Sequence, residues 1–385
     1  MKAFKYKLEP NKTQEAAMER TLVTCRYLYN ASLAERIDKY KADKTSVNYV
    51  QQANALSDKK NEWQEQVHSQ VLQDVLKRLD KSFKRFFTGL KSKRRVGFPR
   101  FKNQRRFKSF CYPQSGFKLL DNGHIRLSKI GDVRLKLSRP IEGQIKTCAI
   151  VKDVDQWFVV LTCETAVVAP TKNDKPTIGV DVGITTFCTM SDGSVIENPR
   201  TLVKSQKKLA QVQKRLSRKI KGSKRRNKQR IKVAKVHRKI RRQRDDFLHK
   251  TSTSLVKKYG TIVFEDLNIA GMMKNHCLAK HIGDASWNKL IQLTTYKAES
   301  ANGRVVLVNP RGTSQRCSGC GEKVTKTLAD RIHCCHQCGL VMDRDWNASI
   351  NIKNRLGSSL INAQGDDVRQ TEFAKAQFSL QSSLN

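Results

Sequence analysis

The sequence predicts an α/β protein with several domains: a small antiparallel β-barrel interrupted by a helical bundle, followed by an α/β domain with a cysteine-rich insertion. Residues 116–165 alternate apolar and polar side chains, which is typical of antiparallel strands. Residues 10–90 instead repeat apolar side chains at helical spacing. Beyond residue 175, two short apolar strands each carry an acidic residue, and two Cys-x-x-Cys pairs follow.

The charge of the chain limits the class of its partners. Lysine and arginine number 75 against 34 acidic residues, which gives a net charge of +41. A polyanion would relieve this self-repulsion, so nucleic acid is the expected partner and a membrane surface is the weaker alternative. No apolar run approaches the ~18 residues of a membrane-spanning helix, and no signal peptide is recognised. We therefore expect a reducing cytosol and reduced cysteines.

The barrel is expected to combine a first strand at residues 1–9 with strands in residues 109–170. Apolar and basic residues alternate in the first strand, and turn signals such as Asn122–Gly123 separate the later ones. A closed barrel is the natural arrangement because closure removes exposed strand edges. A linker at residues 169–176 would then lead into the next domain.

The intervening residues 10–108 are expected to form a helical domain with a basic loop. Asn11 and Gln14 have the spacing of a capping box at the start of its first helix. Apolar residues then follow helical stripes, and such aromatic and aliphatic residues form a core more often than a base-stacking surface. The stripes consist of Leu22, Tyr29 and Leu33, and of Val71, Leu72, Val75, Leu76, Leu79, Phe83, Phe86 and Phe87.

The loop at residues 91–108 has two interpretations. Gly97 and Pro99 prevent one continuous helix there, so the loop could be a solvated linker. Its charge density favours contact with phosphates, and Phe98 or Phe101 is available to pack or to stack on a base. The candidate phosphate-binding residues are Arg94, Arg95, Arg100, Arg105 and Arg106.

A second basic segment spans residues 201–250, with 21 lysines and arginines against two aspartates. Apolar residues keep helical spacing on both sides of Lys221–Ser223, which predicts two helices with basic outer faces. A charged run is usually only a solvated face. One this dense and one-sided favours a track for a nucleic-acid backbone.

Three acidic positions indicate a metal-dependent nuclease. Asp181 interrupts a buried strand, Glu265 ends a second one, and Asp343 and Asp345 stand where a turn enters an amphipathic helix. A buried, unpaired carboxylate costs several kcal/mol, so it usually has a cation or strong donors beside it. Acids in this order are typical of the ribonuclease-H-like fold, which holds two Mg²⁺ or Mn²⁺ ions ~4 Å apart. Any one of these acids alone would more often be structural.

The cysteines predict a structural zinc site. Cys317 and Cys320 form one Cys-x-x-Cys pair and, after fourteen residues, Cys335 and Cys338 form another. Four thiolates at this spacing typically form a zinc ribbon, and no redox role is expected. Cys334 could compete with Cys335, but only Cys335 keeps the spacing to Cys338.

With these motifs in view, the chain resembles the TnpB family of transposon-encoded RNA-guided nucleases, relatives of the compact type V CRISPR effectors. The resemblance covers roughly residues 1–355 and rests on the cysteine pairs and on residues 25–30, 97–101, 179–183, 264–267 and 343–348. It implies that the barrel is a wedge-like domain and that the helical insertion is a recognition domain. It also implies a RuvC-like nuclease at residues 175–356 with a zinc ribbon at 312–342. Residues 357–385 lie beyond the resemblance and are expected to form a flexible tail.

The resemblance also implies a set of functional residues and partners. It assigns the catalytic, metal-binding acids to Asp181, Glu265 and Asp345, with Asp343 in a supporting role. Tyr49 and Gln73 fall where family members contact a short motif beside the DNA target. The implied partners are a guide RNA from the transposon end and double-stranded DNA. The expected location is the prokaryotic cytoplasm, in association with the nucleoid. The sequence does not determine the oligomeric state, and a monomer is favoured.

Rival functions remain at this point. An RNA-guided repressor without catalysis would lack the acids, and all three are present. A transposase proper has no supporting sequence context here. A compact CRISPR effector stays open because a neighbouring repeat array would lie outside this sequence.

Overall fold

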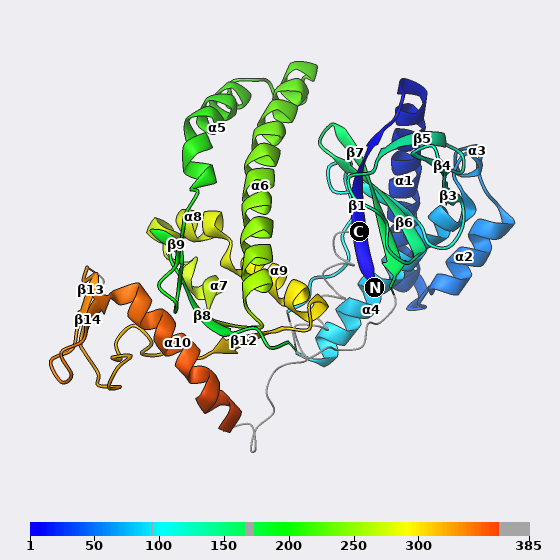
Figure 1. Cartoon of the computed structure of the whole chain (residues 1–385). Coiled ribbons are helices and arrows are strands. Elements are labelled where there is room, and N and C mark those ends of the chain that lie inside the picture. Colours follow the sequence, from blue (N-terminus) through cyan, green and yellow to red (C-terminus); the bar gives the residue numbers. More distant parts are fainter. Residues whose placement is uncertain (94, 166–172, 328, 362–385) are drawn as a thin grey trace. The chain divides into compact units, whose positions relative to one another are not determined.

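The chain divides into two compact units, Met1–Val168 and a second unit that begins at Ala169 (Figure 1). The computed structural model describes residues 1–93, 95–165, 173–327 and 329–361. The expected tail therefore lies outside the described residues from residue 362 on, as do residues 169–172 of the expected linker. Among the described helices, none is long and apolar enough to cross a membrane.

A seven-stranded antiparallel sheet forms the centre of the first unit, in the order β2-β6-β7-β1-β5-β4-β3. Strand β1 pairs with both β5 and β7, so the first strand joins the sheet across the helical insertion, as expected. The strands are β1 (Lys2–Glu9), β2 (Ser109–Tyr112), β3 (Phe117–Leu119), β4 (His124–Leu127), β5 (Gly131–Lys136), β6 (Gln144–Asp153) and β7 (Gln156–Glu164).

The expected closed barrel is not found. No ladder joins the edge strands β2 and β3 in the described part of the chain, so the sheet is open. Only residues 113–116 connect these two edges, a distance of at most about 18 Å in extended chain, so the sheet must curl strongly. Side-chain contacts join these two edges instead. The rings of Tyr112 and Phe117 are 6.5 Å apart, and the Tyr112 hydroxyl donates a hydrogen bond to the Ser128 carbonyl at 2.9 Å. The three residues of β3 offer too little backbone for a continuous ladder.

Four helices fill the insertion between β1 and β2. The predicted capping box is confirmed, because Asn11 and Gln14 each accept the backbone N–H of the other. The long helices share one apolar core with the sheet, and their predicted stripes are buried as far as Leu79. Phe87 is an exception, since 54% of it is exposed. The helices are α1 (Lys12–Asp43), α2 (Tyr49–Asp58), α3 (Glu62–Glu65) and α4 (Ser69–Lys91).

The second unit is built on a five-stranded sheet with the order β10-β9-β8-β11-β12. Strand β8 is antiparallel to β9 and parallel to β11, and β11 is parallel to β12. A two-stranded ladder, β13 with β14, belongs to the cysteine-rich insertion. The strands are β8 (Thr177–Val182), β9 (Thr186–Met190), β10 (Val195–Glu197), β11 (Thr261–Glu265), β12 (Arg304–Val308), β13 (Ile332–Cys334) and β14 (Val341–Asp343).

Helices cover both faces of this sheet. Helices α6 and α9 share one apolar core with β8 and β11, and α10 forms a separate core with β11 and β12. Helix α10 continues to Ile361, past residue 356, where the tail was expected to begin. The helices are α5 (Thr201–Ser217), α6 (Lys224–Lys258), α7 (Ile269–Met272), α8 (His276–Ala285), α9 (Trp287–Ser300) and α10 (Arg344–Ile361).

Helix α10 packs directly on the backbone of Gly179. A Cβ at this position would lie 2.1 Å from the Ser349 carbonyl oxygen and 2.6 Å from the Lys353 nitrogen. We expect Gly179→Ala to lower the melting temperature of the second unit, because overpacking costs about 1–3 kcal/mol. Gly97→Ala is the matched control, because no described residue lies within 4 Å of its added Cβ. Calorimetric melting curves that are identical for the two variants would contradict this packing.

Candidate functional site

The alternation of side chains along β8 and β11 places two acids on the same face of the sheet. Ile178 and Val180 of β8 lie in the core with α6 and α9, so Asp181 points to the opposite face. On β11, Val263 packs in the core that α10 forms, and Glu265 lies two residues further along the same face. Both carboxylates therefore face α10.

Helix α10 supplies the third acid. Its Ser349 lies over Gly179, two residues before Asp181 on β8. Asp345 lies four residues before Ser349, a displacement of about 6 Å along the helix axis. Two residues along a strand span a similar distance, about 6.6 Å. The charge of Asp345 acts on the pKa of Asp181, so the two carboxylates are neighbours. Three acids from distant positions in the sequence thus gather on one face of the sheet.

The pKa of each acid in this group is raised. For Asp181 it lies well above the ordinary value, because of burial first and then the charges of Glu265 and Asp345. Burial also raises the pKa of Glu265, against a hydrogen bond from Thr313, and that of Asp345, together with the charge of Asp343. A bound cation would oppose these effects, because it favours the ionised form of a carboxylate.

Asp343 has a different position from Asp345. Its carboxylate accepts the backbone N–H groups of Asp345 at 2.8 Å and Trp346 at 2.9 Å, so it caps the start of α10. Asp343 is exposed and Asp345 is half-buried. The cap fixes the first turn of α10, which carries Asp345.

The four predicted cysteines form a cluster in the structure. The Sγ atoms of Cys317, Cys320, Cys335 and Cys338 all lie within 4.8 Å of one another. The 317–338 pair is 3.6 Å apart and the 320–335 pair is 3.5 Å apart. Zinc–thiolate bonds of about 2.3 Å imply sulfur separations of about 3.8 Å in a tetrahedron. Four soft donors at this spacing fit one zinc ion, and Cys334 stands outside the cluster on β13.

The acids are spaced more widely than the cysteines. Among the described residues, only the four cysteines are close enough to share a single ion. A site with two ions needs no such close gathering, because its carboxylates are distributed around ions ~4 Å apart.

Sequence reasoning missed the residues that connect these two sites. Thr313 contacts Glu265, while Asn347 and Asn351 of α10 bind the loop that leads into the cysteine cluster. Asn347 and Asn351 lie four residues apart on an otherwise amphipathic helix, and this spacing was the available signal.

The predicted nucleic-acid contacts lie in the first unit, and Arg94 lies outside the described residues. Arg95, Arg100, Arg105 and Arg106 are exposed, while Tyr49 and Gln73 are half-buried on α2 and α4.

The two phenylalanines of the basic loop differ. Both are exposed, Phe98 to 44% and Phe101 to 55%, but Phe98 also packs edge-on against Phe83 and Phe86 and so anchors the loop. Asn30 of α1 also holds the loop through both backbone groups of Lys102, at 2.8 and 2.9 Å.

The second basic segment forms the helical hairpin of α5 and α6 (Figure 1). Asp284 of α8 ties down its base: the carboxylate accepts the Thr201 hydroxyl and the Leu202 N–H, both at 3.0 Å, and pairs with Arg244 at 2.7 Å. The two predicted helices are present, and Gly222 with a φ of +89° permits the turn between them.

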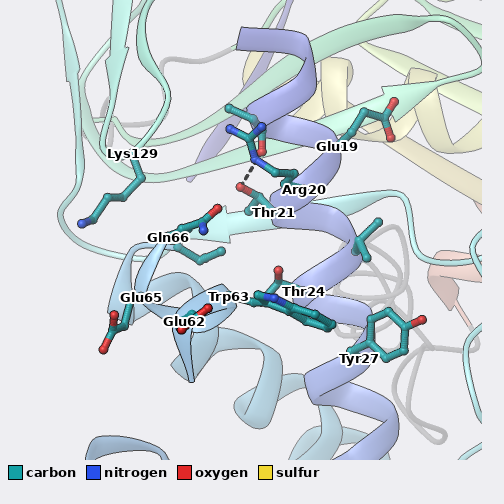
Figure 2. A pocket seen from close by; sticks show the side chains of 13 residues that line it. Glu19, Arg20, Thr21, Thr24, Tyr27, Glu62, Trp63, Glu65, Gln66 and Lys129 are labelled. Atoms are coloured by element: carbon teal, nitrogen blue, oxygen red, sulfur yellow. Dashed lines mark hydrogen bonds between the residues drawn. The ribbon is translucent and has the colours of Figure 1, made fainter. Parts of the chain in front are cut away.

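A groove of about 1090 Å³ in the first unit lies between α1 and α3 and was not anticipated (Figure 2). Trp63 is 62% exposed there and its ring lies 6.4 Å from that of Tyr27. Glu19, Glu62 and Glu65 also line the groove, together with Arg20 and Lys129, so its lining carries charges of both signs. Among the described residues, none of the predicted nucleic-acid contacts lines it.

Comparison with known proteins identifies the family. Residues 159–276 match the OrfB_IS605 family, described as "Probable transposase", and residues 1–45 match its "Helix-turn-helix domain". Residues 287–352 match the "Cas12f1-like, TNB domain". The chain is 33% identical over 373 residues to "Putative RNA-guided DNA endonuclease InsQ" of Escherichia coli K12, with 91% of each chain covered. The chain belongs to the TnpB family.

Other relatives agree with this membership. A Streptomyces pristinaespiralis protein named "Putative RNA-guided DNA endonuclease" is 36% identical over 380 residues, covering 96% of this chain and 92% of its own. A Cas12f1 endodeoxyribonuclease of Sulfoacidibacillus thermotolerans is 26% identical over 230 residues, covering 55% and 53%. A cryo-EM structure of a Cas12f1–sgRNA–target DNA complex has the same fold at 15% identity, with a TM-score of 0.56 over 89% of this TnpB chain and 82% of its own.

The raised pKa values give a prediction for this TnpB protein in buffer without Mg²⁺ or Mn²⁺. A carboxylate whose pKa is raised on folding destabilises the folded state once it is ionised. Asp181→Asn should therefore raise the melting temperature at pH 7 to 8, and the gain should vanish below the unfolded pKa of about 3.9. Asp121→Asn, at an exposed turn of the first unit, is the control. A pH-independent gain would show that charge is not the cause.

The cysteine cluster gives a second prediction. The wild type should carry one zinc ion per chain, and Cys→Ser at position 317, 320, 335 or 338 should remove it and lower the melting temperature. Cys334→Ser should retain the metal, because Cys334 is outside the cluster. Metal analysis by mass spectrometry checks both. Zinc lost with Cys334→Ser but kept with Cys335→Ser would reverse the ligand assignment.

Proposed function

We propose that this protein is a transposon-encoded, RNA-guided DNA endonuclease whose second unit is a ribonuclease-H-like nuclease of the RuvC type. One observation carries the proposal: Asp181, Glu265 and Asp345 come from two strands and a helix and gather on one face of one sheet. The strand order, three antiparallel strands followed by two parallel ones, fits that fold. Relatives named as RNA-guided DNA endonucleases support the same function.

In this proposal the three acids hold two Mg²⁺ or Mn²⁺ ions. Bound there, the ions would activate the attacking water and stabilise the leaving oxygen of the DNA backbone. The chain contributes position: β8 and β11 fix two carboxylates, and the Asp343 cap fixes the helix that carries the third. Burial at Glu265 limits water around the site, which strengthens charge interactions there.

The four cysteines are proposed to hold one structural zinc ion, because four thiolates would complete its tetrahedral coordination and leave no open position for catalysis. The two ladder strands of the insertion are only three residues long each. So short a pair is marginal alone, and the ion would supply much of its stability.

The basic loop and the α5–α6 hairpin are proposed to bind the guide RNA and target DNA through phosphates, while base pairing with the guide reads the sequence. Residues 10–108 would be the recognition domain, and residues 1–9 with 109–170 the wedge domain. The nuclease would span residues 175–356, with the zinc ribbon at 312–342. Tyr49 and Gln73 would read a short motif beside the target. InsQ matches this chain with higher identity and coverage than the Cas12f1 relative does. This difference favours a transposon-encoded nuclease over a CRISPR effector.

Removing the acids tests the nuclease centre. Asp181→Ala, Glu265→Ala and Asp345→Ala should each slow plasmid cleavage a thousandfold or more, roughly 4 kcal/mol in the barrier. DNA binding by the protein–RNA complex should be largely unchanged, because other residues contact the phosphates. Asp343→Ala should be milder, since it removes a helix cap. If Asp343→Ala were inactive and Asp345→Ala fully active, then Asp343, and not Asp345, would be the third metal-binding acid.

Guide dependence separates this function from protein-read DNA recognition. Protein stripped of RNA by ribonuclease should be less stable, and for that reason poorly soluble, at moderate salt, because the unneutralised charge of +41 destabilises the compact state by self-repulsion. It should not cut duplex DNA, because no guide is present to pair with the target. Adding the cognate RNA should restore cutting, and changing only the guide portion should move the cut. The assay is cleavage of a plasmid library. Specific cutting that persists without RNA, at unchanged sites, would contradict the proposal.

A further inference from the structure

Thr313 lies against one of the proposed catalytic acids. It is 1% exposed, and its hydroxyl Oγ1 is 2.5 Å from Oε1 of Glu265. The Pro310 carbonyl is a second, longer contact at 3.0 Å. Because the hydroxyl has a single proton, it donates to the closer, charged acceptor. The bond limits rotation of a carboxylate that is itself only 8% exposed.

Thr313 belongs to a segment that α10 holds by its side chains. We call residues 309–318, which join β12 to the first cysteine pair, the ribbon stem. Asn347, Asn351 and Arg355 lie at intervals of four on α10 and therefore face the same side. Asn351 donates to the carbonyls of Thr313 at 2.9 Å and Arg316 at 2.7 Å, while Arg355 donates to two further stem carbonyls.

The far end of the ribbon stem belongs to the cysteine cluster. Cys317 is buried in the stem, with its Sγ 3.6 Å from that of Cys338. Asn347 joins this end to α10 at two points, donating to the Arg316 carbonyl at 2.7 Å and accepting the Ser318 N–H at 2.9 Å. Asn347 lies two residues from Asp345. One short segment thus connects the cysteine cluster to Glu265 and to the start of α10.

We propose that Thr313 is a positioning residue for Glu265 and that the metal-bound cysteine cluster holds Thr313 in place through the ribbon stem. Divalent-ion affinity at the acids then depends on metal at the cysteines, although no ligand is shared. This inference rests on the proposed nuclease function. It adds a coupling between the two metal sites of the chain and assigns a role to a residue outside both ligand sets.

The positioning role is tested by Mn²⁺ binding to the full-length chain, stripped of RNA and kept at high salt. The readout is the Mn²⁺ concentration at half-maximal rise in melting temperature. Thr313→Val should raise this concentration about tenfold or more, as loss of a hydrogen bond to a ligand does. Thr313→Ser should restore it to nearly the wild-type value. Thr294→Val is the matched control, because Thr294 is equally buried but donates to a helix carbonyl.

The outcomes of this first test are distinct. An unchanged Mn²⁺ requirement in Thr313→Val, or a failure of Thr313→Ser to restore it, overturns the positioning role. Mn²⁺ stabilisation of the wild type that survives Asp181→Ala contradicts the proposed function itself, and this inference with it.

The coupling is tested by a double-mutant cycle with Cys320→Ser, which should remove zinc and also raise the Mn²⁺ requirement. The double variant Thr313→Val/Cys320→Ser should require the same Mn²⁺ concentration as the single variant with the higher requirement. This is expected because both changes remove the same restraint on the Glu265 carboxylate. Cys338→His, which keeps four ligands, should behave as wild type. If Cys320→Ser does not fold, Asn351→Ala replaces it, since it releases the stem and keeps the cysteines. Additive effects in the cycle overturn the coupling.

Discussion

The close approach of α10 to β8 at Gly179 is the contact on which the rest of the second unit depends. The helix backbone occupies the space of a side chain there, so no other residue fits without movement. Because the helix is fixed at this point, its first turn lies beside Asp181 and its Asn347–Asn351 stripe meets the loop after β12. The close packing at Gly179 thus determines the position of Asp345 and the position of the cysteine-rich insertion.

This protein has unbalanced charge of opposite sign in two places, at its surface and at its group of buried acids. Its surface carries a large positive excess, with a net charge of +41, while its proposed nuclease centre gathers carboxylates whose pKa values are raised by burial and mutual repulsion. Each problem is relieved by a ligand of the opposite charge: a polyanion outside and divalent cations inside. The folded chain by itself is therefore less stable than its contacts suggest, and its proposed partners supply part of its stability.

Local sequence rules predicted some features and could not reach others. The Asn11–Gln14 capping box, the buried strands around Asp181 and Glu265, and the four-cysteine spacing each depend on residues close in sequence. Alternating apolar and polar residues predict strands, but they do not determine whether the two edge strands of a curled sheet pair with each other. The gap between β2 and β3 therefore could not be predicted from the sequence. The contact of Thr313 with Glu265 joins residues 48 positions apart, so only the fold reveals it.

The place of β1 in its sheet has a consequence for biosynthesis. Its seven residues from Lys2 to Leu8 pair with β7, which ends at Glu164, so the earliest strand to leave the ribosome must wait for one of the latest in its unit. At 5–20 residues per second that delay is on the order of 10–30 s. Until β5 emerges both edges of the strand are free, and until β7 emerges one of them still is, which is the condition in which nascent chains associate wrongly. Lys2, Lys5 and Lys7 would repel a second copy, so the charge that suits the finished protein to nucleic acid also protects its first strand while it waits.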